Sequence, residues 1–239
     1  MDVLLPVLAV LFPGRCVGCG VAPAALCPGC LARARPVPAT PGPSPPPGID
    51  WWVAAFAYEG VVREGLARVK YRNARSALPL LAGALVDRLR RAPPPGPVDV
   101  VTWPPTSAAR RRQRGFDQAE HLARAVGRGL DVPVRRCLFR RAGPAQTGRT
   151  ARERRHGPVF GKARSVAGRR VLVVDDVATT GATLAAAAAS LRSAGATWVG
   201  AAIVARTPLR VGPAPGGAAS GADRSRGAQG AAPGSRYSR

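Results

Sequence analysis

The 239-residue sequence predicts an α/β fold, with a central, mainly parallel sheet flanked by helices and a small cysteine-rich module ahead of it. The first observation is an unbroken apolar run at 171–174, followed by a polar loop, an alanine-rich stretch at 184–194 and a second apolar run at 197–205. This order is typical of a parallel βαβ unit. The second is a set of four cysteines near the N-terminus. The length allows one buried α/β domain of about 150 residues with smaller attachments.

The four cysteines have the spacing of a zinc site. Cys16 and Cys19 form one C-x2-C turn, Cys27 and Cys30 form a second, and seven residues separate the two turns. Two such turns complete a tetrahedral site of four thiolates, which is closed and therefore structural. Two disulfides or free thiols are the alternative, and the lack of a secretory signal favours zinc over them. We predict that zinc folds a segment too small to fold alone.

Changes in composition divide the chain into segments. The predicted segments are an apolar helix with the zinc module at 1–35, a proline-rich linker at 36–49, a main domain at 50–210 and a disordered tail at 211–239. The apolar stretch 3–12 follows Asp2 rather than a basic segment, and it is shorter than the ~20 residues of a membrane span. We therefore expect a short helix packed on the body, no membrane span, and a cytoplasmic protein.

Hydrophobic periodicity predicts the elements of the main domain. Strands are expected where β-branched and aromatic residues run together, and helices where apolar residues recur every three or four positions. The predicted strands are 51–58, 98–102, 132–137, 171–174 and 197–205. The predicted helices are 60–71, 77–89, 116–130 and 184–194, the last closed by Gly195. Residues 139–170 show little pattern and are predicted to form a long loop.

Two carboxylates follow the apolar run 171–174. Asp175 and Asp176 are predicted at the carboxyl end of a central strand, where ligands bind in open α/β folds. There they can accept hydrogen bonds from two adjacent hydroxyls of a sugar. In the structural alternative the acids only cap the next helix, but one acid and one threonine would suffice for that, and the sequence has the string DDVATTGAT.

The segment between the acids and the predicted helix favours a phosphate. Backbone N–H groups of residues 180–183 lie at a helix N-terminus, Gly181 permits close approach, and nearby threonine hydroxyls add donors. A Walker-type P-loop is excluded because no Gly-Lys-Ser/Thr follows the glycine. Phosphate together with ribose is therefore the predicted ligand chemistry.

Basic residues are concentrated in one region. Of the 36 basic residues only Lys70 and Lys162 are lysines, and residues 110–155 hold 14 arginines against four acids, a net charge of +10. Such density favours a phosphate-rich partner, either a small polyphosphate or nucleic acid. An arginine-biased composition with a solvated surface is the alternative.

Residues 171–184 resemble the motif that binds phosphoribosyl diphosphate (PRPP) in type I phosphoribosyltransferases. The cysteine pairs, Lys70-Tyr71-Arg72, the RGFDQAE segment, the segment 146–155 and this loop also come in the order seen in the ComF family (competence protein F). The resemblance covers nearly all of residues 1–207.

The resemblance implies a type I phosphoribosyltransferase fold that binds PRPP with Mg²⁺ bridging its diphosphate and ribose. Asp175 and Asp176 would contact the ribose hydroxyls and serve as the catalytic acids. The implied PRPP-binding residues are Asp175, Asp176, Ala178, Thr179, Thr180, Gly181, Ala182, Thr183, Arg114 and Gly115. The last two match the family's pyrophosphate-binding loop. Arginines and Mg²⁺ would stabilise the departing pyrophosphate as the sugar carbon becomes cation-like.

Three functions stay open at this point. The first is a phosphoribosyltransferase with an unknown acceptor, because Thr179 stands where purine-salvage relatives often carry an acid. The second, which can coexist with the first, is implied by the name of the family: a non-enzymatic accessory protein of DNA uptake, which binds single-stranded DNA through its arginine-rich loops and works with competence proteins. The third is a PRPP-binding fold that has lost its catalysis. Lys70 with Arg72 is either a phosphate contact or a solvated helix end.

Overall fold

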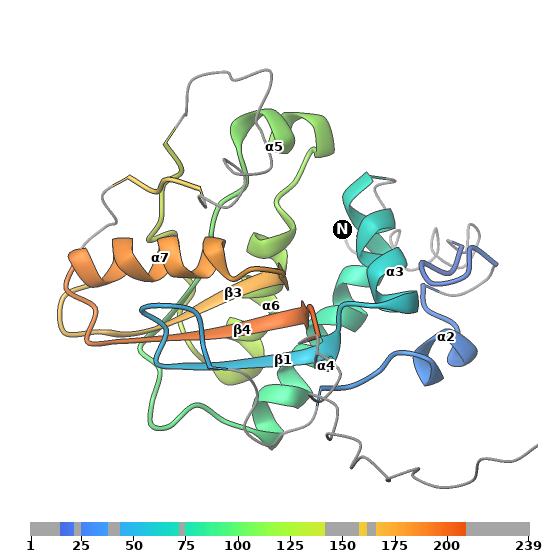
Figure 1. Cartoon of the computed structure of the whole chain (residues 1–239), viewed down its shortest axis with the longest axis horizontal. Helices are drawn as coiled ribbons and strands as arrows, with labels where there is room; N and C mark the ends of the chain where they lie inside the picture. Colours follow the sequence, from blue (N-terminus) through green and yellow to red (C-terminus); the bar gives the residue numbers. More distant parts are fainter. Residues whose placement is uncertain are drawn as a thin grey trace, which may run out of the picture. The chain divides into compact units, whose positions relative to one another are not determined.

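The computed structural model describes residues 15–21, 25–37, 44–71, 75–141, 158–161 and 166–208. A four-stranded sheet with the order β1-β4-β3-β2 forms their centre, and every neighbouring pair of strands runs parallel (Figure 1). The strands are β1 (Trp51–Ala57), β2 (Val100–Thr102), β3 (Arg170–Ala178) and β4 (Trp198–Arg206). The predicted α/β class with a parallel sheet is confirmed. The segments 3–12, 146–155 and 211–239 lie outside the described residues.

Helices cover both faces of the sheet (Figure 1). The helices of the described residues are α2 (Pro28–Ala32), α3 (Gly60–Tyr71), α4 (Leu78–Arg91), α5 (Ala108–Arg114), α6 (Gln118–Leu130) and α7 (Ala182–Ser193), with a short 3-10 helix, η1 (Arg75–Ala77). Side chains alternate along β3, so Leu172 and Val174 join the core built with α3, α4 and α6. Val171 and Val173 join the core built with α7. Within the described residues, no helix has both the length and the apolar character that a membrane crossing needs.

Strand β3 is longer than the prediction. The apolar run was expected to end at Val174, but pairing with β4 continues through Asp175↔Ile203 to Ala178↔Arg206. Polar side chains do not end a strand when the neighbouring strand still supplies backbone hydrogen bonds. The two acids therefore lie within the paired part of β3, near its carboxyl end, rather than in the loop beyond it.

The predicted strand at 132–137 is wrong except for one bridge, Val134 with Val101. Pro133 has no N–H to donate, and the N–H of Cys137 donates to the hydroxyl of Thr102 at 3.2 Å instead of to a strand. These residues thus run beside β2 without forming a continuous ladder.

A helix that periodicity did not predict, α5, follows β2. It has no buried residue, so no apolar stripe marks it in the sequence. Its caps are nevertheless visible there, because Ser107 accepts a hydrogen bond from the N–H of Arg110 at 3.3 Å and Gly115 ends the helix at φ 73°. Helix α6 then begins at Gln118, two residues later than predicted.

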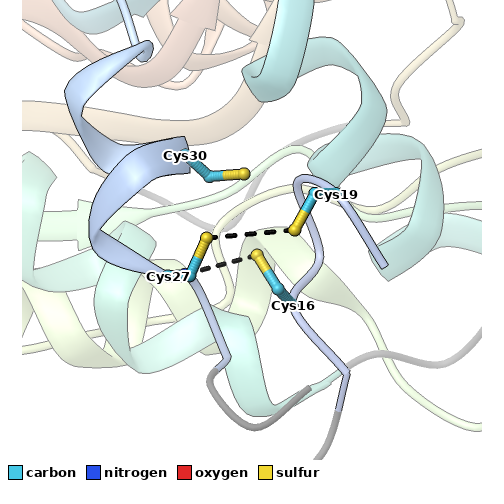
Figure 2. A group of neighbouring side chains, drawn as sticks. All are labelled: Cys16, Cys19, Cys27 and Cys30. Carbon is cyan, nitrogen blue, oxygen red and sulfur yellow. Dashed lines mark hydrogen bonds between the residues drawn. The ribbon is translucent and has the colours of Figure 1, made fainter. Parts of the chain in front are cut away.

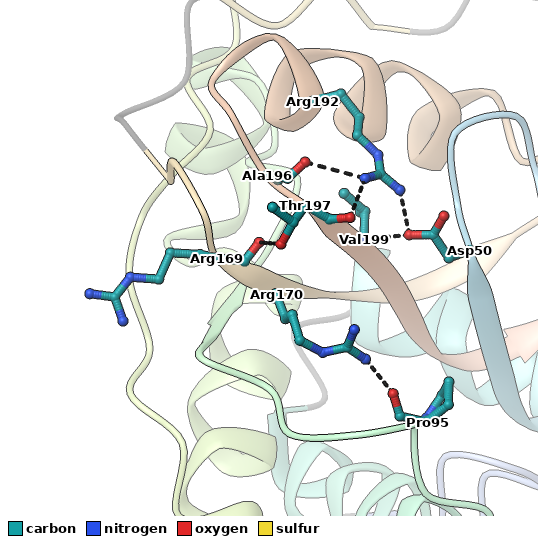
Figure 3. Close-up of polar contacts among 8 residues, drawn as sticks. All are labelled: Asp50, Pro95, Arg169, Arg170, Arg192, Ala196, Thr197 and Val199. Atoms are coloured by element: carbon teal, nitrogen blue, oxygen red, sulfur yellow. Dashed lines mark hydrogen bonds and ion pairs between the residues drawn. The ribbon is translucent and has the colours of Figure 1, made fainter.

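The amino-terminal ends of β3 and β4 are held by arginines (Figure 3). Arg192, near the end of α7, pairs with Asp50 and donates to the carbonyl of Thr197 at 2.7 Å. Asp50 in turn accepts the N–H of Val199 at 2.8 Å. Arg170 donates to the carbonyl of Pro97 at 2.7 Å. These contacts fix the end of the sheet that lies opposite the acids.

Helix α7 ends in a Schellman motif that depends on Gly195. The N–H of Gly195 bonds to the carbonyl of Arg192 at 2.9 Å and that of Ala196 to Leu191 at 3.1 Å, with Gly195 at φ 91°. A Cβ at this position would lie 2.9 Å from Cα of Ala167. The predicted role of Gly195 at the helix end is confirmed, one residue beyond the Ala194 cap.

We expect Gly195→Ala to lower the free energy of unfolding by about 1–2 kcal/mol, because alanine is strained at positive φ. Gly83→Ala, in the exposed interior of α4 where a Cβ meets nothing within 4 Å, should instead raise it by up to about 1 kcal/mol. Urea unfolding of the two variants measures both. Equal effects of the two substitutions would contradict the Schellman interpretation.

Candidate functional site

The two acids of β3 have different surroundings. Asp175 is buried, and its Oδ1 accepts the backbone N–H of Asp176 at 2.8 Å. Alternation along the strand assigns Asp176 to the face of Leu172 and Val174, which packs on α3, and Asp175 to the face that packs on α7. The predicted carboxylate pair is therefore present, but the sheet separates its two members by face.

Lys70 forms an ion pair with Asp176. Its Nζ lies 2.8 Å from Oδ2 of Asp176, and the two side chains are only 22% and 13% exposed. Lys70 is thus neither a solvated helix end nor an isolated phosphate contact. It joins the end of α3 to the end of β3, a link that sequence spacing did not suggest.

The surroundings of Asp175 and Lys70 shift the pKa values of both groups. Burial raises the pKa of Asp175 well above its usual range, and the neighbouring charge of Asp176 raises it further, while Lys70 acts in the opposite direction. Burial alone lowers the pKa of Lys70, but Asp176 and then Asp175 outweigh it, so the pKa of the ammonium is raised. Lys70 therefore stays charged at neutral pH.

The segment after the acids leads directly into the N-terminus of α7. Gly181 is the N-cap of α7 at φ 75°, and the N–H of Ala182 donates to the hydroxyl of Thr180 at 3.3 Å. A Cβ on Gly181 would lie 2.7 Å from Cγ of Pro46, so both the φ and the close contact require glycine. Thr179 and Thr180 are exposed. The first N–H groups of a helix have no partner within it and carry the positive end of its dipole.

Arg114 lies near the acids through a short chain of contacts. It is the last residue of α5 rather than a loop residue as predicted, and Gly115 is the αL cap that follows it. The Arg114 guanidinium lies 5.6 Å from the centre of the Tyr71 ring and donates to Gln118 Oε1 at 3.1 Å. Tyr71 directly follows Lys70, so Arg114 contacts the same end of α3 that carries the lysine paired with Asp176.

Asp117 links the residues on either side of α5. Its Oδ2 accepts the N–H of Thr106 at 2.8 Å, which joins the residues before α5 to those after it. Burial raises the pKa of Asp117, although hydrogen bonds from backbone N–H groups act against this. Sequence patterns gave no role to Asp117 or Tyr71, because their partners lie far away along the chain or on the other side of a helix.

The four predicted cysteines converge (Figure 2). The ligand atoms of Cys16, Cys19, Cys27 and Cys30 all lie within 4.8 Å of one another, and Sγ of Cys19 lies 3.9 Å from Sγ of Cys27. Tetrahedral Zn–S bonds of about 2.3 Å place the sulfurs about 3.8 Å apart, so the set fits zinc. No disulfide joins any two of the five cysteines, which contradicts the disulfide alternative.

Electrostatics also fit a cation at this centre. Burial raises the pKa of Cys16, but backbone N–H donors outweigh it and lower the pKa to about 6. Arg33 lowers the pKa of Cys30, yet burial and the neighbouring cysteines raise it to about 11. Four thiolates at this spacing repel one another unless a metal compensates their charge. A Cβ on Gly18 would lie 2.6 Å from Sγ of Cys30, which explains a glycine in the first turn.

The cysteine centre is attached to α3. Arg68 donates to the carbonyls of Val17 and Gly18, both inside the first C-x2-C turn. Gly65 lets Val17 approach, since a Cβ there would lie 3.4 Å from Val17 Cγ2. The helix that carries Lys70 into the acid pair is therefore the same helix that holds the cysteine turn.

Residues 113–220 match the family model described as the phosphoribosyl transferase domain. The match covers less than half of the chain and includes Arg114, the β3 acids and the loop before α7. The predicted fold class, a phosphoribosyltransferase-type α/β fold with a four-cysteine cluster near the N-terminus, is confirmed. A comparison with curated protein sequences finds no match.

Solved structures similar to this chain include two large enzymes. These are the allosteric regulatory enzyme of purine biosynthesis (23% identity, TM-score 0.37) and glutamine PRPP amidotransferase from B. subtilis complexed with ADP and GMP (25% identity, TM-score 0.37). Each alignment covers 54% of this chain and 26% of the other, so the chain spans about a quarter of their length. Purine phosphoribosyltransferase from Pyrococcus horikoshii OT3 aligns at 19% identity and TM-score 0.33, over 57% of this chain and 77% of that one.

We expect Asp175→Asn to stabilise the protein increasingly as pH rises. A group whose pKa is raised by folding contributes stability below its unfolded value of about 4, and this contribution is lost as pH rises through the folded value. Asparagine mimics the protonated acid and keeps the oxygen that accepts the Asp176 N–H. The difference in unfolding free energy should grow by about 1 kcal/mol or more between pH 4 and pH 8. A difference that is constant over this range would contradict the buried-acid assignment.

We expect the purified protein to contain about one equivalent of zinc, with the metal lost in Cys27→Ala and retained in Cys137→Ala. Cys137 is buried but lies outside the cluster, so it controls for the loss of a thiol. Elemental analysis measures both. Less than about half an equivalent in the parent protein would argue against a structural zinc site.

Proposed function

We propose that the protein is a ComF-type phosphoribosyltransferase that binds PRPP with Mg²⁺ and transfers phosphoribose to an acceptor. The observation that carries the proposal is the buried carboxylate pair next to the N-terminus of α7, in a stretch that matches the phosphoribosyl transferase domain. Acids for sugar hydroxyls and N–H groups for a phosphate thus follow one another within nine residues, 175–183.

The residues suggest how PRPP would lie. The 5′-phosphate fits the N–H groups of residues 180–183, where helix geometry and the hydroxyls of Thr180 and Thr183 supply donors. The ribose hydroxyls would donate to Asp175 and Asp176. Arg114 and the N–H groups near Gly115 would face the diphosphate across the end of α3.

Transfer would break the bond between C1 of the ribose and the diphosphate oxygen, and the acceptor would form its bond at the same carbon. As that bond lengthens, negative charge gathers on the leaving pyrophosphate, and Arg114 can stabilise it. Mg²⁺, when bound with PRPP through the oxygens of the ligand, supplies further positive charge there. The acids hold the ring through its hydroxyls and stabilise the cation-like carbon.

The loop 175–183 supports PRPP as the ligand, but it does not indicate which acceptor receives the phosphoribosyl group. Thr179 is exposed and offers no carboxylate to deprotonate a nucleobase, so the acceptor is not assigned. The match to a phosphoribosyl transferase domain favours phosphoribosyl transfer over the alternative of a non-enzymatic protein that binds single-stranded DNA.

We expect PRPP with Mg²⁺ to raise the melting temperature by several degrees, since a ligand at 100 times its Kd stabilises the folded state by about 2.7 kcal/mol. The double variant Asp175→Asn plus Asp176→Asn should remove the shift. The control is Asp87→Asn plus Asp131→Asn, which removes two charges at exposed positions and should keep the shift. No shift in the parent protein would sink the proposal.

A further inference from the structure

Lys70 binds one of the four carboxylate oxygens of the proposed ribose site. Its Nζ contacts Oδ2 of Asp176 at 2.8 Å, and Oδ1 of Asp175 accepts a backbone N–H. The oxygens that these two contacts do not use, Asp176 Oδ1 and Asp175 Oδ2, would receive the two hydroxyls of a ribose. A sugar that donates to this pair meets oxygens whose direction the lysine and the backbone have already set.

The charged and titratable groups around Lys70 come from two strands. Asp176 and Asp175 face it from β3, and Tyr58 faces it from the end of β1. Lys70 is the cation of this group, and it balances one of the two acids. Without it, two adjacent carboxylates in a mostly buried position would compete for one proton.

Helix α3 holds Lys70 in place from the opposite side. Val69, next to it, is buried in the core, and Arg68 is fixed by the carbonyls of the first cysteine turn. The core packing of Val69 and the hydrogen bonds of Arg68 thus fix the end of α3 from which Lys70 reaches Asp176. A fixed backbone limits the conformations that the long lysine side chain can adopt.

We propose that Lys70 is a positioning residue of the ribose site, which holds the Asp176 carboxylate through their ion pair and directs the remaining carboxylate oxygens at the ribose hydroxyls. This inference rests on the proposed function. It assigns Lys70 no contact with the reacting atoms, and it differs from a purely structural ion pair in one respect: the lysine decides the pH range in which the site accepts a sugar.

The experiment compares ribose 5-phosphate with methyl phosphate as calorimetric ligands from pH 6 to pH 9. Both are phosphate monoesters with a second pKa of about 6, so the ratio of their affinities isolates the contribution of the sugar and removes the titration of the phosphate itself. In the parent protein the ratio should favour ribose 5-phosphate and change little over this range.

Lys70→Met should lower the ratio about tenfold near pH 7 and let it recover as pH rises, because the acid pair then keeps a proton until higher pH. Lys70→Arg should restore most of the parent ratio, and Lys70→Gln repeats the test if the methionine variant does not fold. Arg63→Met removes one positive charge from an exposed position of the same helix and should leave the ratio unchanged.

An unchanged ratio and pH profile in Lys70→Met would overturn the inference while leaving the proposed function intact. A parallel loss of both affinities in Lys70→Met and Lys70→Gln would also overturn it, since this would show a general structural role. A parent protein that binds methyl phosphate but gains nothing from the ribose would overturn the proposed function as well.

Discussion

The ion pair between Lys70 and Asp176 joins segments that the chain keeps far apart. Strand β3 places two adjacent carboxylates where the sheet is still paired and mostly buried, and isolated buried charges of one sign are strongly disfavoured. A cation has to lie beside them, and α3 supplies it at 2.8 Å. The position of α3 relative to β3 is therefore a condition for keeping the acids in the end of the strand.

The four-cysteine centre can be understood from the same requirement. Its first turn accepts two hydrogen bonds from Arg68, two residues before Lys70, and packs Val17 on Gly65 one turn earlier. A closed set of four sulfurs leaves no position for a substrate, which agrees with a structural role. The centre stabilises one helix, and that helix delivers the lysine to the carboxylates and Tyr71 to Arg114.

Sequence patterns predicted the elements that bury an apolar stripe and missed those that do not. Helix α3 has the predicted bounds, whereas α5 buries nothing and was visible only through its caps, Ser107 and Gly115. The continuation of β3 through Asp175 and Asp176 depends on backbone pairing with β4, which side-chain polarity does not report.

The site shows the same division. The cysteine spacing predicted the sulfur cluster because both turns are local, and the string from Asp175 to Thr183 predicted a helix N-terminus preceded by acids. The pairing of Lys70 with Asp176 spans more than a hundred residues, so no local spacing contains it. The same holds for the contact of Arg114, the last residue of α5, with Tyr71, the last residue of α3.

The central claim is that the end of β3 and the start of α7 together hold a ribose phosphate. An experimental structure of the complex with PRPP and Mg²⁺ tests it most directly. The account predicts the 5′-phosphate at the N–H groups of residues 180–183, the ribose hydroxyls on Asp175 and Asp176, and the diphosphate facing Arg114. A ligand bound only among the arginines of α5, with the carboxylate pair untouched, would contradict it.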